Sequence, residues 1–370
     1  MSKLIKICHL TSAHPHLDVR IFEKECTSLV KAGFEVKLIV AKGEETQVNG
    51  VHIIKVKSPK GSRFKRMWMT AKLVYKRGLK EDAEIYHFHD PELLRFALRL
   101  KRKGKKVIYD AHEDLPRQIL TKYWIPSPFR KVIAGLVERY ENYVSSRLDA
   151  IIAATPTIGM RFKEVNNNTI VINNFPVIYP SKAPLKKEGE KYLCYVGGIS
   201  EIRGVRGQVD AMEYLPNIKL KMAGKFSPIS IKNELEKSSG WRSVEYLDYL
   251  NRDEVRELLT NSIAGLVLFH PLPNHLDALP NKMFEYMSEG VPVIASNFPS
   301  WKSIIVDNEC GVCVNPESPE EIANAAKMFE NDPALSKKMG EKGRKMVQEK
   351  YNWSIEEKKL LSLYSELLAV

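Results

Sequence analysis

Short apolar stretches alternate with amphipathic stretches along this chain. In the first half, apolar runs of strand length precede segments in which apolar residues recur at helical spacing. The predicted strands are 4–11, 34–41, 51–56, 84–89, 106–110, 150–154 and 169–173, and the predicted helices are 19–32, 91–103 and 129–146. This alternation predicts a mostly parallel sheet with helices on both faces.

The second half repeats the pattern. The predicted strands are 192–196, 218–222, 244–247, 264–269, 292–295 and 311–314, and the predicted helices are 251–261, 319–331 and 333–368, the last broken near Asn352. We therefore expect an α/β protein with two tandem Rossmann-like domains. Their expected bounds are 1–175 and 192–350, with a Pro- and Lys-rich linker over 176–191 and a final helix over 351–370.

Composition agrees with two cores of ordinary size. The 370 residues are 44% hydrophobic and 28% charged, which is typical of soluble proteins. No apolar run is long enough to cross a bilayer, and the N-terminal apolar run is too short for a signal peptide, so we expect a cytoplasmic location. The five cysteines predict reduced thiols, and the Cys310–Cys313 pair lacks the further ligands of a zinc site.

Positive charge is concentrated in the first half. Residues 1–175 carry 32 Lys and Arg against 18 Asp and Glu, whereas residues 176–370 carry 25 against 27. The segment 55–80 has ten basic residues and no acidic one. Its apolar residues recur at helical spacing, namely Phe64, Met67, Trp68 and Ala71. Such a segment is typical either of a helix on an anionic membrane or of a domain helix with a solvated basic side. No nucleic-acid-binding motif accompanies the charge, so we expect no nucleic-acid partner.

The segment 264–296 combines a strand, a polar loop and a helix that starts near Pro280. Four polar residues lie in the loop or the first helical turns, namely Asp277, Asn281, Lys282 and Glu285. Ligands of open α/β sheets bind at the carboxyl ends of strands, where helix N-termini favour phosphate. A diphosphate at this helix start, with the carboxylates on sugar and ribose hydroxyls, fits the pattern. Alternatively, Glu285 is an ordinary i,i+3 partner of Lys282 in a simple βαβ unit.

A glycine-rich turn, YVGGISEIRGV, opens the second half at residues 195–205. Gly197 and Gly198 let the backbone approach a phosphate closely, and Arg203 can bind one in a bidentate manner. A solvated cation at the start of a helix is the alternative for Arg203. The spacing does not fit the dinucleotide fingerprint, which argues against NAD.

Three strand ends of the first half gather histidines and carboxylates. The residues are His14, His16, Asp18, Arg20, His87, His89, Asp90, Asp110, His112 and Glu113. Because these strands are expected to be parallel, their carboxyl ends meet at one edge of the sheet. His87, His89, Asp90 and His112 could ligate a metal. Alternatively, the histidines are core residues, and Asp90 is a good N-cap for the helix that follows it.

The run FEYMSEGVPVIAS at 284–296 resembles the signature of retaining GT-B glycosyltransferases of family 4, of the capsular or exopolysaccharide type. In that family a Glu-x7-Glu pair accompanies the run, and here the first acid is Asp277 and the second is Glu285. The glycine pair followed five residues later by Arg203 is similar to the family's donor loop, although many relatives have Arg in place of Gly198. Relatives with the HxHD motif, here residues 87–90, are metal-independent.

This resemblance implies the GT-B arrangement, with two domains facing across a cleft and the last helix crossing back. It implies a retaining transfer from a nucleoside-diphosphate sugar to a free or lipid-linked saccharide, without metal or other cofactor. The implied donor-binding residues are Gly197, Gly198, Arg203, Leu279, Pro280, Asn281, Lys282 and Glu285. The implied catalytic residues are His89, Asp277, Arg203 and Lys282, and the implied acceptor-binding residues are His16, Asp18, Arg20, Asp90, His112 and Glu113. A sugar-nucleotide epimerase and a non-catalytic membrane- or polysaccharide-binding protein remain as alternatives.

Overall fold

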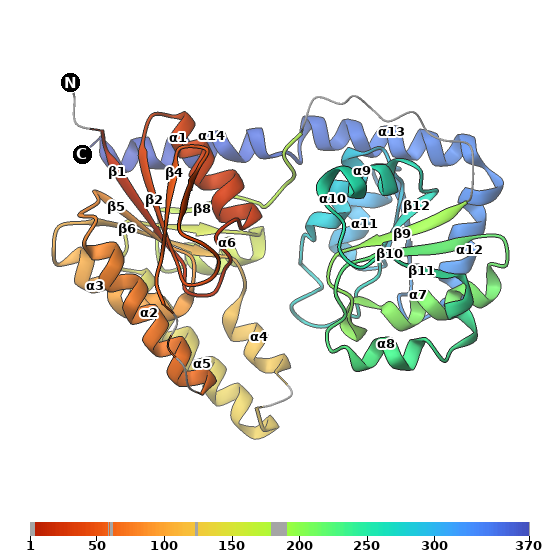
Figure 1. The fold of residues 1–370 in the computed structure, drawn as a ribbon, viewed down its shortest axis with the longest axis horizontal. Coiled ribbons are helices and arrows are strands. Elements are labelled where there is room, and N and C mark those ends of the chain that lie inside the picture. Colours follow the sequence, from red (N-terminus) through yellow and green to blue (C-terminus); the bar gives the residue numbers. More distant parts are fainter. Residues whose placement is uncertain (1–3, 58, 60–61, 123–124, 179–190, 370) are drawn as a thin grey trace. The chain divides into compact units, whose positions relative to one another are not determined.

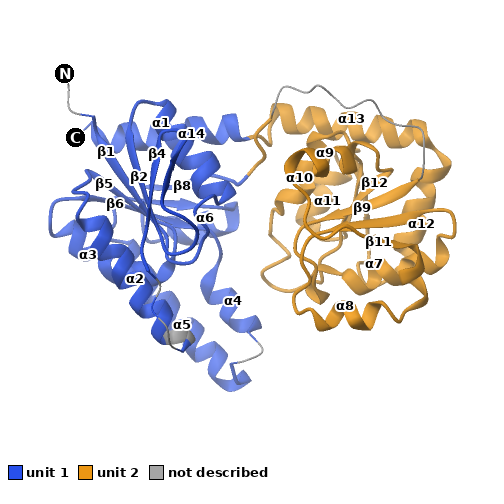
Figure 2. Ribbon diagram, viewed as in Figure 1, with its two compact units in different colours: residues 1–174, 353–370 blue, residues 175–352 orange. Residues whose placement is uncertain are grey.

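The chain forms two compact α/β units in a computed structural model that describes residues 4–57, 59, 62–122, 125–178 and 191–369. Unit 1 comprises residues 1–174 and 353–370, and unit 2 comprises residues 175–352 (Figures 1 and 2). Most of the predicted linker, residues 179–190, lies outside the described residues.

Unit 1 is built on an eight-stranded sheet with the order β3-β4-β2-β1-β5-β6-β7-β8. Its strands are β1 Lys6–Leu10, β2 Glu35–Val40, β3 Thr46–Val48, β4 Val51–Lys55, β5 Ile85–Phe88, β6 Lys106–Ala111, β7 Ala150–Ala153 and β8 Thr169–Val171. All neighbours are parallel except β3 and β4. The seven predicted strands are confirmed. Among the described strands of this unit, the sequence missed β3, because this short edge strand is largely exposed and lacks an apolar pattern. The short helices α4 and α6 were not predicted either.

The helices of unit 1 include the end of the chain. They are η1 Val19–Cys26, α1 Thr27–Lys31, α2 Arg63–Leu79, η2 Pro91–Leu93, α3 Leu94–Lys101, α4 Leu115–Thr121, α5 Ser127–Ser145, α6 Pro156–Lys163 and α14 Trp353–Leu368. The predicted helix 19–32 is a π-helical segment that continues into α1. Helix α14 docks on this segment, since the Trp353 indole donates to Ser28 Oγ at 3.0 Å.

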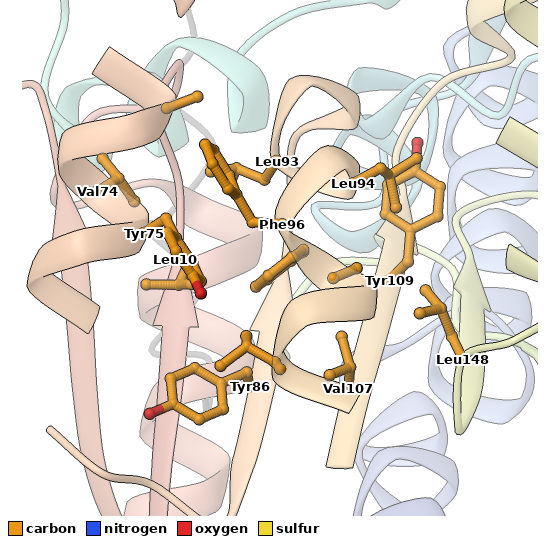
Figure 3. Packing of buried hydrophobic residues seen from close by; sticks show 14 of the residues in the cluster. Leu10, Val74, Tyr75, Tyr86, Leu93, Leu94, Phe96, Val107, Tyr109 and Leu148 are labelled. Carbon is orange, nitrogen blue, oxygen red and sulfur yellow. The ribbon is translucent and has the colours of Figure 1, made fainter. Parts of the chain in front are cut away.

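A cluster of buried hydrophobic residues covers one face of the unit 1 sheet. Leu10, Tyr86 and Tyr109 project from three strands toward α2 and α3 (Figure 3). Tyr75 of α2 and Phe96 of α3 stack in the same cluster, with ring centroids 4.4 Å apart. Because side chains alternate along a strand, the histidines of β1 and β5 lie on the opposite face.

Helix α2 buries only part of its predicted apolar side. Ala71 is fully buried, whereas Met67 and Trp68 are 42% and 61% exposed. The outer surface of α2 therefore combines apolar side chains with exposed basic residues, namely Lys65, Arg66, Lys72 and Lys76. Among the described residues, no helix has both the length and the apolarity that crossing a membrane requires.

Unit 2 is built on a six-stranded parallel sheet with the order β11-β10-β9-β12-β13-β14. Its strands are β9 Tyr192–Val196, β10 Lys219–Ala223, β11 Val244–Tyr246, β12 Ala264–Val267, β13 Val293–Ser296 and β14 Gly311–Val314. Its helices are η3 Glu201–Arg203, α7 Val205–Ala211, η4 Met212–Tyr214, α8 Ser230–Leu235, η5 Ser239–Ser243, α9 Arg252–Thr260, α10 Asn281–Ser288, α11 Pro299–Ile305, α12 Pro319–Asn331 and α13 Pro333–Glu349. The six predicted strands are confirmed, as is the break near Asn352.

Each sheet has one point at which the strand order changes direction. In unit 1 the chain runs outward from β1 to β2 and β4, and then returns to β5 on the other side of β1. In unit 2 it runs outward from β9 to β10 and β11, and returns to β12 beside β9. Loops that leave the carboxyl ends of two such strands diverge, so ligands of open α/β sheets bind between them.

Candidate functional site

The loop after β9 brings the two predicted cations of unit 2 against a pair of glycines. Gly197 has a φ of +121°, which favours glycine. A Cβ atom on Gly197 would lie 3.2 Å from Lys282 Nζ, and one on Gly198 would lie 2.6 Å from Arg203 Nη1. Any larger residue here would therefore push one of the cations away. The glycine pair keeps the space in front of this loop open.

Lys282 lies in the first turn of α10 and is only 8% exposed. Its ammonium nitrogen is 3.6 Å from the centroid of the Tyr195 ring, and no described residue hydrogen-bonds to it. Burial and the charge of Arg203 lower the pKa of Lys282 well below its ordinary value, and Glu285 opposes this shift. A buried amine without an acceptor is costly, and a bound anion would supply both an acceptor and a negative charge.

Arg203 ends the short helix η3. Its Nη1 donates to Gly198 O at 3.1 Å, and its guanidinium lies 5.7 Å from the centroid of the Phe269 ring. Lys282 Nζ lies 5.8 Å from the centroid of the same ring. The two cations therefore flank one aromatic side chain at the switch point of the sheet.

Helix α10 begins at Asn281, as predicted, and no side chain caps its N-terminus. Its first backbone N–H groups have no partner within the helix, and they favour an anion. Leu279 packs on the apolar cluster of unit 2, and Glu285 is half-buried on the helix. Asp277 lies in an exposed turn before the helix. The functions of these residues, of Pro280 and of Asn281 stay predictions.

The loop before α10 is held by two side chains that the sequence did not indicate. The Trp301 indole donates to Ala278 O at 2.7 Å, and Ser300 Oγ donates to Leu276 O at 2.5 Å. Tyr195, whose ring lies under Lys282, was also missed. Its place in the apolar strand 192–196 is typical of a core residue, and nothing in the sequence indicates that the helix 281–288 lies beside it.

In unit 1, Arg20 and Asp110 form a buried bidentate ion pair. Arg20 Nε and Nη2 donate to Asp110 Oδ2 and Oδ1 at 2.9 and 2.8 Å. His112 Nε2 lies 2.9 Å from the same carboxylate. Burial acts to raise the pKa of Asp110, but Arg20 and His112 hold it well below its ordinary value. Arg20, predicted to bind the acceptor, is thus 4% exposed and paired inside the unit.

His89 belongs to a buried chain of hydrogen bonds. Its Nε2 lies 2.9 Å from His9 Nδ1, and its Nδ1 lies 3.2 Å from His112 Nε2. His87 Nδ1 lies 2.7 Å from the hydroxyl of Tyr364, which connects α14 to this network. Burial lowers the pKa of His89 to about 4, so the ring is neutral at physiological pH. Both ring nitrogens of the predicted catalytic histidine are therefore engaged within unit 1, and its catalytic function stays a prediction.

Two groups in the described part of unit 1 have metal-ligand chemistry. They are His9, Glu25, His87 and His89, and His89, Asp110 and His112. The predicted alternative set included Asp90, which neither group contains. Arg20 lies 3.1 Å from Glu25 and binds Asp110. The carboxylates of both groups thus already face a fixed guanidinium, which would repel a second cation.

Asp90 binds the loop after β1 rather than the helix that follows it. Its Oδ2 accepts hydrogen bonds from Thr11 Oγ1, Ser12 N and Ala13 N at 2.8, 2.6 and 3.2 Å, and its Oδ1 lies 3.1 Å from His14 Nδ1. Asp90 occupies the predicted N-cap position before η2, but its side chain makes no capping hydrogen bond there. The loop after β1 and the N-terminus of η2 both offer hydrogen-bond donors to the Asp90 carboxylate. The loop offers three donors, so the carboxylate binds the loop.

The remaining residues predicted to bind the acceptor differ in exposure and in hydrogen bonding. Asp18 accepts from the backbone N–H groups of Arg20 and Ile21 and so caps η1. His16 is half-buried, and its Nδ1 has no hydrogen-bond partner among the described residues. Glu113 is exposed and accepts a hydrogen bond from Gln118. Whether any of them contacts an acceptor stays a prediction.

Comparison with protein families matches both halves of the chain. Residues 20–175 match the family described as Glycosyltransferase Family 4, and residues 180–346 match Glycosyl transferases group 1. Each half of the chain is thus similar to a glycosyltransferase family. Both similarities agree in class with the resemblance at 284–296.

Two curated relatives align with part of the chain. The alpha-1,3/1,6-mannosyltransferase ALG2 of Dictyostelium discoideum is 29% identical over 168 residues, or 45% of this chain and 34% of ALG2. The capsular polysaccharide biosynthesis glycosyltransferase CapM of Staphylococcus aureus is 24% identical over 186 residues, or 48% of this chain and 46% of CapM. The matched region thus spans less than half the length of each of these relatives.

Solved structures match the fold over nearly the whole chain. Sucrose-phosphate synthase from Thermosynechococcus elongatus superimposes with a TM-score of 0.77 at 18% identity, covering 99% of both chains. The lipopolysaccharide glycosyltransferase WaaG gives a TM-score of 0.73 at 16% identity, covering 96% of this chain and 98% of WaaG. Anabaena HepE, solved with UDP and glucose, gives 0.74 at 13% identity, covering 98% and 100%. The predicted GT-B fold class of two Rossmann-like domains with parallel sheets is therefore confirmed.

Proposed function

We propose that this chain, which is similar to a glycosyltransferase family in each half, transfers a sugar from a nucleoside-diphosphate sugar to a saccharide acceptor with retention of anomeric configuration. One observation carries the proposal. Arg203 and the unpartnered ammonium of Lys282 gather at the switch point of unit 2, beside two glycines and an uncapped helix start. This is the arrangement that a diphosphate requires.

The donor would place its diphosphate against the first N–H groups of α10, between Arg203 and Lys282. Negative charge develops on the diphosphate as its bond to the sugar breaks, so both cations stabilise the transition state more than the ground state. Glu285 would accept hydrogen bonds from the ribose hydroxyls, and Asp277 would bind the sugar. These cations supply the charge that a metal provides in other sites, so the proposed transfer needs no metal or other cofactor.

The acceptor is proposed to be a saccharide on a lipid carrier. Support comes from exposed apolar residues on α5, spaced three or four positions apart. They are Phe129, Val132, Ile133, Leu136, Tyr140 and Tyr143. Helix α2 adds Met67 and Trp68 beside the exposed basic residues Lys65, Arg66 and Lys72. We propose that both helices contact an anionic membrane surface on its cytoplasmic side.

The test is a panel of uridine, guanosine and adenosine sugar nucleotides, read first by thermal shift. A ligand of the native state raises the melting temperature by mass action. With the stabilising donor, Arg203→Ala and Lys282→Ala should each lower turnover by roughly 10²–10³-fold, as the removal of one transition-state donor does elsewhere. No shift with any donor, or full turnover in both variants, would refute the site. Conversion of the donor sugar to an epimer without an acceptor would instead indicate an epimerase.

A further inference from the structure

A tyrosine of helix α10 takes the place of a strand partner at the switch point of unit 2. Strands β9 and β12 flank this point, and the last residues that pair between them are Cys194 and Gly265. Strand β9 continues to Val196. There the backbone N–H of Val196 donates a hydrogen bond to the hydroxyl of Tyr286 at 2.8 Å. The helix is thereby bonded to the carboxyl end of β9.

The ring of Tyr286 occupies the space that a side chain on Gly265 would need. A Cβ atom on Gly265 would lie 2.3 Å from Tyr286 Cδ2, which is too close for a real contact. Tyr286 is fully buried, and burial raises its pKa well above the ordinary value, so its hydroxyl stays protonated. Tyr286 therefore contacts both strands of the switch point, β12 through its ring and β9 through its hydroxyl.

Lys282 precedes Tyr286 by one helical turn, so both side chains lie on the same side of α10. The ammonium nitrogen of Lys282 lies 3.6 Å from the centroid of the Tyr195 ring. Tyr195 and Val196 are consecutive residues of β9. Successive turns of the helix thus contact successive residues of the strand, and the contact of Tyr286 sets the position of Lys282.

The ring beside Lys282 is itself held in place. Tyr195 is buried, and its hydroxyl donates to Gly198 O at 2.6 Å. Arg203 Nη1 donates to the same carbonyl oxygen at 3.1 Å. One carbonyl group therefore connects the ring beside Lys282 to the second cation of the site. A shift of α10 along β9 would move Lys282 out of this arrangement.

We propose that Tyr286 is a positioning residue of the donor site, which holds Lys282 where it meets the diphosphate. This inference rests on the proposed glycosyltransferase function. The ring and the hydroxyl of Tyr286 fix α10 against the end of β9. The ammonium one turn earlier is then in place before the donor arrives, so binding requires no rearrangement of the helix. Tyr286 is buried and acts through Lys282.

Neighbouring groups make the charge of Lys282 a reporter of its position. Burial and the charge of Arg203 lower the pKa of Lys282, whereas Glu285 and Cys194 raise it. The ring of Tyr195 attracts the charged form. A bound diphosphate raises this pKa, so binding takes up a proton. If α10 is released from β9, water reaches the amine, its pKa in the free protein returns toward the ordinary value, and the proton uptake falls.

The experiment titrates uridine, guanosine and adenosine diphosphate into the full chain by calorimetry, in two buffers of different ionisation enthalpy. Tyr286→Phe keeps the ring and removes the hydroxyl. For the diphosphate that binds the wild type, we expect the affinity of Tyr286→Phe to be roughly tenfold lower, as the coupling of residues in one contact network allows. The proton uptake on binding should also be smaller than in the wild type.

Tyr192→Phe is the matched control. The Tyr192 hydroxyl donates to Leu258 O at 2.9 Å, so this variant also removes a buried hydrogen bond of β9. That bond lies at the first residue of the strand and joins it to α9 rather than to α10. Tyr192→Phe should lower the melting temperature, as Tyr286→Phe does. It should keep the wild-type affinity and the wild-type proton uptake.

Gly265→Ala is a second test, because its Cβ atom would displace the Tyr286 ring while the hydroxyl remains. It should weaken diphosphate binding as well, and it decides the proposal by the same two readouts if Tyr286→Phe does not fold. Wild-type affinity or wild-type proton uptake in Tyr286→Phe overturns the positioning function and leaves the proposed function standing. An equal loss in Tyr192→Phe overturns it too, because the effect would then be a general loosening of unit 2. If none of the three diphosphates binds the wild type, the inference falls together with the proposed function.

Discussion

The ammonium nitrogen of Lys282 lies 3.6 Å from the centroid of the Tyr195 ring and has no hydrogen-bond partner among the described residues. The ring face attracts the cation, but it does not replace the hydrogen bonds that burial removes. Folding therefore places a charge where it is poorly solvated. Such a site is costly without a ligand and favourable with an anionic one.

Replacing Lys282 by methionine should separate stability from binding. Lys282→Met removes an unsatisfied buried donor, so we expect the free energy of unfolding to rise by about 1–3 kcal/mol without ligand. The same variant should lose the donor-induced thermal shift. The pKa of Lys282 is lower in the folded than in the unfolded chain. Charged Lys282 therefore lowers the free energy of unfolding most at pH values below its pKa in the folded chain. The increase in unfolding free energy on Lys282→Met should become smaller as the pH rises above that pKa.

Lys302→Met provides the control, because Lys302 is an exposed lysine of α11. It should change neither the unfolding free energy nor the donor-induced shift by a measurable amount. A Lys282→Met variant that is less stable than the wild type would contradict the view that the site is strained without its ligand.

Donor binding should take up a proton. A bound diphosphate raises the pKa of Lys282 from its lowered value, because the charged form gains an anionic partner. Between the two pKa values the free protein holds a neutral amine and the complex a charged one, so affinity should fall as pH rises. Calorimetric titration in two buffers of different ionisation enthalpy measures this uptake. Equal apparent enthalpies in both buffers would contradict the prediction.

The fold could be predicted because two patterns are clear along the chain, namely short apolar runs of strand length and apolar residues at helical spacing. Thirteen strands were predicted and found, since each is a short apolar run between polar turns. The strand β3 was missed, because its three residues are mostly exposed and carry no pattern. The helix predicted to start near Pro280 begins at Asn281, with Pro280 at its N-cap position.

The sites could be predicted only in part, because a sequence shows which residues follow strands but not which side chains pair. Arg203 and Lys282 could be predicted as binding-site cations because they lie in turns or helix starts that follow predicted strands. The position of the Tyr195 ring beside Lys282 could not be predicted. Asp90 was predicted to cap a helix, and it binds the loop before His14 instead. That loop follows β1, a strand about 80 positions earlier that pairs with β5.

The buried pair of Arg20 and Asp110 should be costly to break from one side. Arg20→Met leaves the carboxylates of Asp110 and Glu25 buried beside each other, and we expect a loss of about 3–5 kcal/mol in unfolding free energy. The double variant Arg20→Met with Asp110→Asn should recover part of this loss, because it removes one of the charges. Urea denaturation of both variants measures the difference. A single variant as stable as the wild type would show that the pair adds nothing to the fold.

The exposed apolar side of α5 should govern membrane association. Phe129 and Leu136 are 60% and 59% exposed, and burial of such side chains stabilises by about 1.5–3 kcal/mol each. We expect Phe129→Ser and Leu136→Ser each to weaken binding to phosphatidylglycerol vesicles about tenfold, measured by co-sedimentation. Ile229→Ser is the control, since Ile229 is 63% exposed in unit 2. Because α2 of the same unit carries exposed basic residues, salt should weaken wild-type binding as well. Vesicle binding that survives both substitutions would place the membrane contact elsewhere on the chain.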